Sequence, residues 1–267
     1  MKITFIGGGN MAEAIISGIK ANKIACEILV SEPIESRRKI LEKKYGVMVN
    51  YNNNDLLKES VFVLLAIKPQ IFPNIAKEIK LSLKPSQTII SIMAGISIEN
   101  LTGNLNHKNI IRVMPNTPSQ IGKGCAVWMP TKEVEKNKID IFREILKSCG
   151  SEIQVDSEKN IDIATAISGS GPAYIFLFLQ TLINSATSLG LDKAVAKKIS
   201  VETFLGSAYL ARNRSKSLKE LIEMVTSPGG TTEAGISVLK SKGFSSLVNS
   251  AVLSAYKRGI EISKGKK

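Results

Sequence analysis

The beginning of the chain constrains the fold most, because an apolar run passes directly into a glycine-rich turn. Residues 3–7 predict a short buried strand, and residues 10–20 predict the helix that follows. Gly7, Gly9 and Ala12 match the pattern G-x-G-x-x-[G/A] between them. In this pattern the first glycine makes a tight turn, the second lets a pyrophosphate approach the backbone, and the small third residue packs the helix on the sheet. The segment therefore predicts a dinucleotide-binding unit.

A carboxylate after the second predicted strand, residues 27–31, supports this interpretation. Glu32 stands about twenty residues after the glycines, where an acidic side chain can accept hydrogen bonds from the adenosine ribose of NADH. The same carboxylate would repel the 2′-phosphate of NADPH, whereas Ser31, Arg37 and Arg38 are able to receive one. The sequence leaves the choice between NADH and NADPH open.

Strand-like and helix-like segments alternate through the first part of the chain. The expected strands are residues 3–7, 27–31, 61–66, 88–92 and 110–114, and the expected helices between them are residues 10–20, 36–45 and 71–79. This alternation with right-handed crossovers predicts a doubly wound α/β sheet. After about residue 155 only helical periodicity remains, in residues 172–189, 193–212, 217–225, 232–241 and 245–263. We expect a Rossmann domain over residues 1–156 and an all-α domain over residues 157–267.

The helix near Pro172 predicts a homodimer. Residues 173–179, Ala-Tyr-Ile-Phe-Leu-Phe-Leu, leave no polar face on its first two turns, and a helix that is apolar all round must be buried on every side. In so small a domain the expected cover is a second copy of the chain. The last helix carries a stripe of Leu247, Ala251, Ala255 and Gly259, which fits close helix contact in a dimer and an intramolecular core equally well.

A second glycine-rich segment, Val-Thr-Ser-Pro-Gly-Gly-Thr-Thr at residues 225–232, predicts an anion-binding loop that leads into a helix. Its two glycines let the backbone N–H groups turn inward, and its threonines can cap the helix. Together with the first motif it suggests an enzyme that binds a dinucleotide at one place and a small carboxylate at another.

Composition excludes several other classes. The net charge of +13 comes from lysines scattered through almost every segment, which argues against a nucleic-acid partner. Cys26, Cys125 and Cys149 are odd in number and far apart, so we expect neither disulfides nor a metal site, and a reducing cytoplasm as the compartment. No leader is visible, and the most apolar run, residues 172–183, is too short to span a bilayer, so we expect a soluble protein without a membrane partner.

The single histidine, His107, lies in a polar turn and is expected at the surface, which argues against acid catalysis by a histidine. Cys125 and Trp128 are expected to pack the end of the sheet.

Five motifs carry a resemblance to a known family. They are FIGGGNMAEAI at residues 5–15, LLAIKPQ at 64–70, RVMPNTP at 112–118, SGSGPAYIF at 168–176 and VTSPGGTTEAG at 225–235. In this order and spacing the chain resembles the pyrroline-5-carboxylate reductases from end to end. The resemblance implies a Rossmann domain, a helical dimerisation domain and the reduction of a cyclic imine by NADH or NADPH, the last step of proline biosynthesis. It leaves open whether dimers assemble into a ring and whether related cyclic imines are accepted.

Reduction of a C=N bond needs a held carboxylate, an aligned nicotinamide and a proton donor near the ring nitrogen. The backbone N–H groups of Gly230, Thr231 and Thr232 are expected to hold the carboxylate at the helix N-terminus. The Thr232 hydroxyl is then the expected donor or orienting group, as the resemblance also suggests, and a helix cap is its alternative or additional role.

The resemblance also implies a set of residues at the cofactor. These are Ile6, Gly7, Gly8, Gly9, Asn10 and Met11 around the pyrophosphate, Ser31 and Glu32 at the ribose, Asn53, Ala66, Ile67, Lys68 and Pro69 along the ribose and nicotinamide side, and Ala94 and Gly95 near the nicotinamide. Asn116 fits either the nicotinamide or a rigid turn, and residues 168–171 fit a simple helix start. Two positions depart from the family pattern. Glu32 stands where relatives that prefer NADPH carry a small or neutral residue, and residues 212–216 lack a glutamate that some relatives use near the substrate.

Two other hypotheses remain. A 3-hydroxyacid dehydrogenase opens with a similar glycine motif, but it needs a catalytic lysine on a helix of the second domain, and Lys193, Lys197 and Lys198 have the spacing of surface residues. A nucleotide-binding regulator with a dead site would be expected to have lost the late loop. The loop of residues 225–232 is intact and argues against both.

Overall fold

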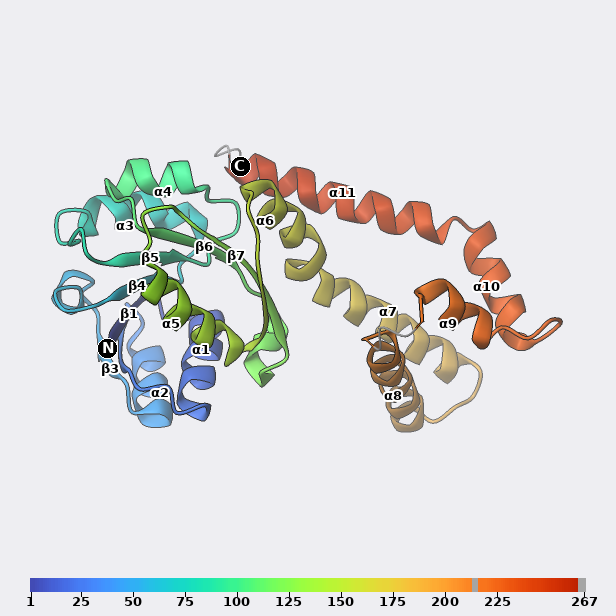
Figure 1. Ribbon diagram of the computed structural model, residues 1–267. Helices are drawn as coiled ribbons and strands as arrows, with labels where there is room; N and C mark the ends of the chain where they lie inside the picture. Colours follow the sequence, from blue (N-terminus) through green and yellow to red (C-terminus); the bar gives the residue numbers. More distant parts are fainter. Residues whose placement is uncertain (213–215, 264–267) are drawn as a thin grey trace. The chain divides into compact units, whose positions relative to one another are not determined.

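The computed structural model describes residues 1–212 and 216–263, which form two compact units (Figure 1). The first unit is Met1–Ser170 with the described residues from Ala255 onward, and the second is Gly171–Ser254. The region between residues 212 and 216, where the sequence lacks the glutamate of some relatives, lies largely outside the described residues.

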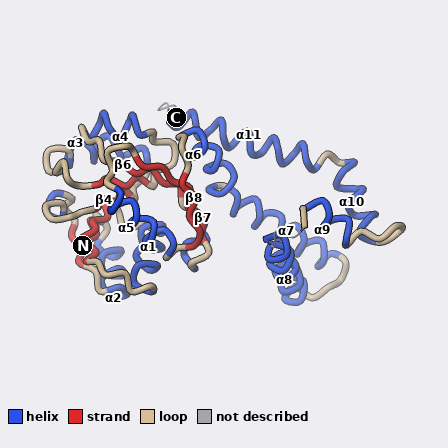
Figure 2. The backbone as a smooth tube through the Cα atoms, in the orientation of Figure 1, coloured by secondary structure: helices blue, strands red, loops and turns tan. Residues whose placement is uncertain are grey.

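The first unit is built on one sheet, drawn in red in Figure 2. Its strands are β1 (Lys2–Ile6), β2 (Glu27–Ser31), β3 (Met48–Asn50), β4 (Phe62–Leu65), β5 (Thr88–Ser91), β6 (Ile110–Met114), β7 (Gly124–Pro130) and β8 (Gly150–Gln154). They lie in the order β3-β2-β1-β4-β5-β6-β7-β8. The strands from β3 to β6 are parallel, β7 runs antiparallel to β6, and β8 is parallel to β7. The order reverses between β1 and β4, and ligands of such sheets bind beyond the carboxyl ends of the strands at this point.

Helices cover both faces of the sheet. They are α1 (Asn10–Ala21), α2 (Glu35–Tyr45), α3 (Phe72–Ile79), α4 (Ile98–Leu105), α5 (Lys136–Lys147) and α6 (Glu158–Ala164), with the 3₁₀ turns η1 (Asn54–Leu56), η2 (Pro69–Ile71) and η3 (Thr117–Ile121) and a π-helical turn η4 (Thr165–Gly169). Buried residues of α1, α2 and α5 share one core with Trp128, which is fully buried. Buried residues of α3 and α4 form a second core on the other face. The first unit therefore has the two-sided packing expected of a doubly wound sheet.

The second unit consists of helices, but it has little core of its own. Its helices are α7 (Gly171–Ser188), α8 (Lys193–Arg212), α9 (Leu218–Met224), α10 (Thr231–Ser241) and the first part of α11 (Phe244–Ser263). Among the described residues of α7 and α8, those buried are Pro172, Ala196 and Ser200. Phe176 is 60% exposed and Leu177 is 70% exposed in the single chain. The apolar surface predicted for this helix therefore exists and is uncovered in one copy.

Three sequence expectations are corrected by the structure. His107 is buried rather than on the surface, and its Nε2 lies 2.8 Å from the Gln87 carbonyl oxygen, because the polar turn directs the ring inward. The apolar run of residues 172–183, which is too short to span a bilayer, is part of a longer helical segment. The helical segment Glu158–Ser188 has 31 residues and is long and apolar enough to cross a membrane by length and composition. Residues 168–171 are not a simple helix start, since residues 168 and 169 belong to the π-helical turn that continues α6, and α7 begins at Gly171.

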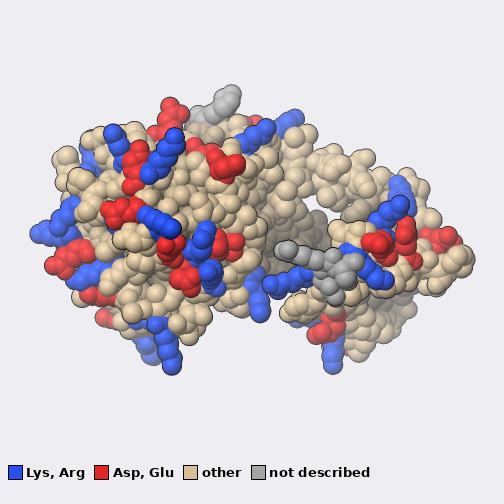
Figure 3. Space-filling model, in the orientation of Figure 1, with Lys and Arg blue, Asp and Glu red and all other residues tan. Residues whose placement is uncertain are grey.

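Charged side chains are interspersed over the face shown in Figure 3, where lysines and arginines alternate with aspartates and glutamates. This agrees with the scattered lysines of the sequence.

Candidate active site

The glycine turn after β1 holds three strand ends together. Gly7 has a φ of +96°, a conformation that favours glycine, and its N–H donates to the Ser31 carbonyl oxygen at 2.7 Å. A Cβ at Gly7 would lie 2.6 Å from the carbonyl oxygen of Ala66, which follows β4, and 3.0 Å from the Ile67 side chain. The first glycine is thus required by the close approach of the backbones after β1 and β4. This brings Ala66 and Ile67 beside the turn, and their contact with a cofactor stays a prediction.

Gly9 has the opposite environment. It is the exposed N-cap of α1, with φ −68° and ψ −176° and no side-chain cap, and a Cβ there would have no neighbour within 4 Å. The first amides of α1, at Asn10 and Met11, therefore begin a helix whose positive end faces open space. An open glycine in front of an uncapped helix N-terminus fits a pyrophosphate. The side chain of Ile6 points into the core, so only its backbone is available to a cofactor.

The Glu32 carboxylate lies next to this turn. The residue is 7% exposed. Its Oε2 accepts a hydrogen bond from the Gly8 amide at 2.8 Å, and its Oε1 accepts one from the Ile34 amide at 2.9 Å. Ser31 is buried at the end of β2. The second strand therefore places a fixed carboxylate beside the glycine turn, where the sequence predicts the ribose.

Some of the other predicted cofactor residues are accessible to a ligand, and one already has a side-chain partner within the protein. Lys68 is exposed and Pro69 is half-buried at the start of η2. Asn53 is almost buried, and its Nδ2 donates to Glu78 Oε1 at 3.0 Å. Its side chain is therefore already held by α3, and a contact with the cofactor stays a prediction.

The loop after β5 contacts the end of α11. Gly95 has a φ of +74° and is buried, and a Cβ there would lie 2.7 Å from the Ile262 side chain and 3.2 Å from the Gly259 carbonyl oxygen. Ala94, just before it, is half-buried. The sequence predicts Gly95 near the nicotinamide but gives no sign of this contact, because residues 95 and 262 are far apart in the chain. One glycine of the small-residue stripe in α11 thus packs on this loop.

The segment after β6 is a rigid turn. Asn116 Oδ1 accepts from the Cys125 amide at 2.8 Å, and its Nδ2 donates to the Ser168 carbonyl oxygen at 3.1 Å. The side chain therefore links the turn to β7 and to the π-helical turn, in agreement with the structural alternative for Asn116. Isolated π-helical turns occur often at functional sites.

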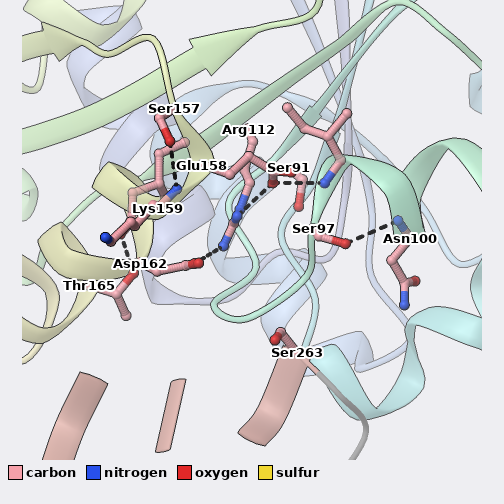
Figure 4. A network of polar contacts seen from close by, with 12 residues as sticks. Ser91, Ser97, Asn100, Arg112, Ser157, Glu158, Lys159, Asp162, Thr165 and Ser263 are labelled. Atoms are coloured by element: carbon pink, nitrogen blue, oxygen red, sulfur yellow. Dashed lines mark hydrogen bonds and ion pairs between the residues drawn. The ribbon is translucent and has the colours of Figure 1, made fainter. Parts of the chain in front are cut away.

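Arg112 is a positioning residue that the sequence did not single out, although it lies in the motif of residues 112–118. It is 2% exposed in β6, and its guanidinium contacts Glu158 Oε1 and Asp162 Oδ1 of α6, each at 2.6 Å (Figure 4). Glu158 Oε1 also accepts from the amide of Ile98 at 2.8 Å, at the start of α4. A buried arginine with two carboxylates thus fixes α6 on β6 and next to α4.

The second unit carries the other predicted site, at the start of α10. Gly229 has a φ of +69°, and Gly230 is the N-cap of α10 without a side-chain cap. The Gly230 amide donates to the Ser227 carbonyl oxygen at 3.0 Å, and the Gly229 amide donates to Glu233 Oε2 at 2.8 Å. The Gly230 amide, which the sequence predicts to hold the substrate carboxylate, is therefore already hydrogen-bonded within a turn. The amides of the first two helical residues, Thr231 and Thr232, carry the open positive end of the helix.

A dinucleotide cradle on a Rossmann sheet and an uncapped helix start on a helical unit define an NAD(P)H-dependent oxidoreductase. Comparison with known proteins gives the family. Residues 2–95 match the family model "NADP oxidoreductase coenzyme F420-dependent", and residues 158–262 match "Pyrroline-5-carboxylate reductase dimerisation".

Similar proteins cover nearly the whole chain. The pyrroline-5-carboxylate reductase of Synechocystis sp. is 36% identical over 266 residues, 99% of each chain. The solved structure of a pyrroline-5-carboxylate reductase from Coxiella burnetii has a TM-score of 0.89 at 36% identity, with 98% of each chain covered. A Plasmodium falciparum pyrroline carboxylate reductase with NADP bound has a TM-score of 0.89 at 30% identity, also with 98% of each chain covered. The chain therefore belongs to the pyrroline-5-carboxylate reductase family.

The dimerisation match explains the uncovered surface of the second unit. Residues 158–262 include α7, whose large apolar side chains are exposed in the single chain. The long apolar segment Glu158–Ser188 lies in the same match, so a protein partner accounts for its composition. The chain thus carries a homodimerisation domain, and family membership favours the imine reductase over the 3-hydroxyacid dehydrogenase.

Proposed function

We propose that this chain reduces the C=N bond of 1-pyrroline-5-carboxylate to L-proline with NADH or NADPH, the last step of proline biosynthesis. The observation that carries the proposal is the start of α10. Gly230 caps this helix without a side chain, which leaves the first amides of the helix and the half-buried Thr232 side chain for a small carboxylate.

The roles of the residues follow from the chemistry. A bound nicotinamide supplies the hydride that adds to the imine carbon. The backbone from Gly9 to Met11 holds the cofactor pyrophosphate, with Glu32 at the ribose. The Thr231 and Thr232 amides hold the substrate carboxylate, and the Thr232 hydroxyl hydrogen-bonds at the ring nitrogen. That nitrogen becomes a basic amine as hydride arrives, so a weakly acidic hydroxyl suffices to deliver or relay the proton.

Parallel assays of NADH and NADPH oxidation test the reaction itself. Purified protein receives 1-pyrroline-5-carboxylate, and the product is identified as proline. Proline formation with either cofactor supports the proposal. A dimer that binds dinucleotide but oxidises neither cofactor would refute this substrate and point to another imine or hydroxyacid.

Substitutions of the two threonines test the role of the hydroxyl. We expect Thr232→Ala to lower kcat by about 100-fold with the dissociation constant of the cofactor unchanged, because a positioned proton donor contributes about that much. Thr232→Ser should restore most of the activity. Thr231→Ala is the matched control, since it removes a neighbouring hydroxyl and keeps the backbone amide, and we expect kcat within about threefold of the wild type. Unchanged turnover in Thr232→Ala would remove the assigned role.

We also propose a soluble cytoplasmic protein that works as a homodimer or a ring of dimers, without a membrane or nucleic-acid partner. We propose that residues 1–156 bind the cofactor and that residues 157–267 serve dimerisation and substrate binding. The proposed boundary lies one residue before the start of the dimerisation match at residue 158. Light scattering after size exclusion in detergent-free buffer should give twice the chain mass or an even multiple of it. A protein recovered only in detergent would contradict the proposal.

A further inference from the structure

We propose that this chain prefers NADH to NADPH, and that two carboxylates enforce the preference: Glu32 faces the ribose, and Glu13 withholds Arg37 from a 2′-phosphate. The inference rests on the proposed function as an NAD(P)H-dependent reductase. It assigns Glu13 a role in specificity, although this residue lies on α1 and is not among the predicted cofactor residues.

The Glu32 carboxylate is arranged to accept from a diol. An ionised carboxylate has about four acceptor positions and no donor. Two positions are used by the amides of Gly8 and Ile34, at 2.8 and 2.9 Å. The positions that remain match the 2′- and 3′-hydroxyls of an unphosphorylated ribose. A 2′-phosphate would bring a second negative charge to a side chain that is 7% exposed, where solvent screens repulsion poorly.

Arg37 is the obvious cation to offset that repulsion, but two of its three guanidinium nitrogens already hold it in another direction. Its Nε donates to the Gly8 carbonyl oxygen at 2.5 Å, and its Nη2 contacts Glu13 Oε2 at 2.5 Å. Glu13 Oε1 accepts from Lys44 Nζ and from the Tyr45 hydroxyl, each at 2.8 Å. Hydrogen bonds from Lys44, Tyr45 and Arg37 lower the pKa of the Glu13 carboxyl to about 2, so it remains ionised and holds the guanidinium at neutral pH.

Arg38 is the remaining competitor. Its Nη1 donates to the carbonyl oxygens of Glu32 at 2.7 Å and Pro33 at 2.9 Å, which ties one of its nitrogens to the backbone. Its other N–H groups can still reach an anion. A wild-type preference for NADPH that disappears in Arg38→Ala would therefore overturn the inference.

Equilibrium binding separates the two cofactors without turnover. The dissociation constants of NADH and NADPH are measured by nucleotide fluorescence on the full-length wild-type protein, without imine, at low and at physiological salt. We expect NADH to bind at least tenfold more tightly. In Glu32→Gln the ratio should fall at least tenfold, because the charge is removed and one acceptor for the ribose is lost. A thermal unfolding curve for each variant confirms that it is folded.

Release of Arg37 tests the role of Glu13. Glu13→Gln should tighten NADPH binding about three- to tenfold with NADH affected less than twofold. The gain should vanish in Glu13→Gln/Arg37→Ala, because the freed guanidinium is its cause. Glu35→Gln is the matched control: it removes the same charge from the first turn of α2, where Glu35 is exposed and paired with Lys39 at 2.6 Å, and should leave the NADPH to NADH ratio unchanged. A gain that persists without Arg37, or that Glu35→Gln reproduces, would refute the role of Glu13.

The outcomes also separate this inference from the proposed function. Tighter binding of NADPH in a protein that makes proline would refute the preference and leave the reductase intact. Tighter binding of NADH without turnover of 1-pyrroline-5-carboxylate would support the preference and refute the proposed substrate. Binding of neither nucleotide would refute both.

Discussion

Alanine at two glycines of the same turn should separate folding from cofactor binding. Gly7 and Gly9 are two residues apart, and both belong to the dinucleotide pattern, yet their surroundings are opposite. A Cβ at Gly7 would meet the Ala66 carbonyl oxygen at 2.6 Å, whereas a Cβ at Gly9 would meet nothing within 4 Å. We therefore predict that Gly7→Ala destabilises the protein and that Gly9→Ala weakens dinucleotide binding in a protein that is as stable as the wild type.

The magnitudes follow from the backbone. A side chain at φ +96° costs about 1–3 kcal/mol in local strain. The 2.6 Å contact adds about 1–3 kcal/mol, because Ala66 is fixed by its own hydrogen bond from N–H to the Ile6 carbonyl oxygen and cannot retreat freely. Gly7→Ala should thus lose about 2–6 kcal/mol. Gly9 has φ −68°, which alanine adopts without strain, so Gly9→Ala should change stability by less than about 1 kcal/mol.

Urea unfolding and nucleotide titration measure the two effects on the same samples. For Gly9→Ala we expect an unchanged urea midpoint and a dissociation constant for NADH raised at least tenfold, since the new methyl group fills the space that a pyrophosphate must enter. Equal loss of stability in the two variants would refute the assignment of Gly7 to folding. Full NADH affinity in Gly9→Ala would refute the assignment of Gly9 to the pyrophosphate.

Three further predictions concern charge and assembly. Arg112→Met should cost about 2–4 kcal/mol in urea unfolding, because it leaves the carboxylates of Glu158 and Asp162 without their buried partner. The pKa of Glu13 falls from 4.5 to about 2 on folding, so its stabilisation is fully present above pH 4.5 and is lost as the pH drops toward 2. In that window the wild type should lose about 1–2 kcal/mol more than Glu13→Gln, and parallel urea titrations at pH 6 and pH 3 would reveal it. Leu177→Lys places a charge on the exposed apolar face of α7 and should shift the protein from dimer to monomer in light scattering, with NADH binding retained.

Apolar runs in the sequence predict those strands of the sheet that are buried on both faces. The strand Glu27–Ser31 and the strand Ile110–Met114 have the predicted bounds, because continuous apolar runs between turns define buried parallel strands. The sequence does not predict the strands β7 and β8 individually. The strand β8 is largely exposed and lacks an apolar run. The π-helical turn at residues 165–169 was missed for a related reason. Its Ser168 carbonyl oxygen accepts a hydrogen bond from Asn116 Nδ2, a long-range contact that no local pattern encodes.

The candidate site shows the same division between local and distant determinants. The glycine motif and the Glu32 position follow from spacing along the chain, so the sequence places them correctly on the strand ends of β1 and β2. The contacts that surround the site residues come from residues distant in the sequence. Arg37 is bound by Glu13 of α1, and Gly95 packs against Ile262 of α11. Long-range partners of this kind require the folded structure, because side-chain type alone does not say which of many charges or methyl groups will meet.

The two units differ in whether a single chain supplies their hydrophobic core. The sheet unit has a buried core on each face, so its dinucleotide cradle is supported within one chain. The helical unit exposes side chains such as Phe176 and Leu177, and its described helices bury few residues of their own. Apolar surface of this extent is stable when a second copy covers it, and the stability of such a unit depends on protomer concentration. The loop at Gly230 belongs to this unit. Dinucleotide binding is therefore expected to persist under dilution, whereas substrate binding and turnover are expected to fall as the dimer dissociates.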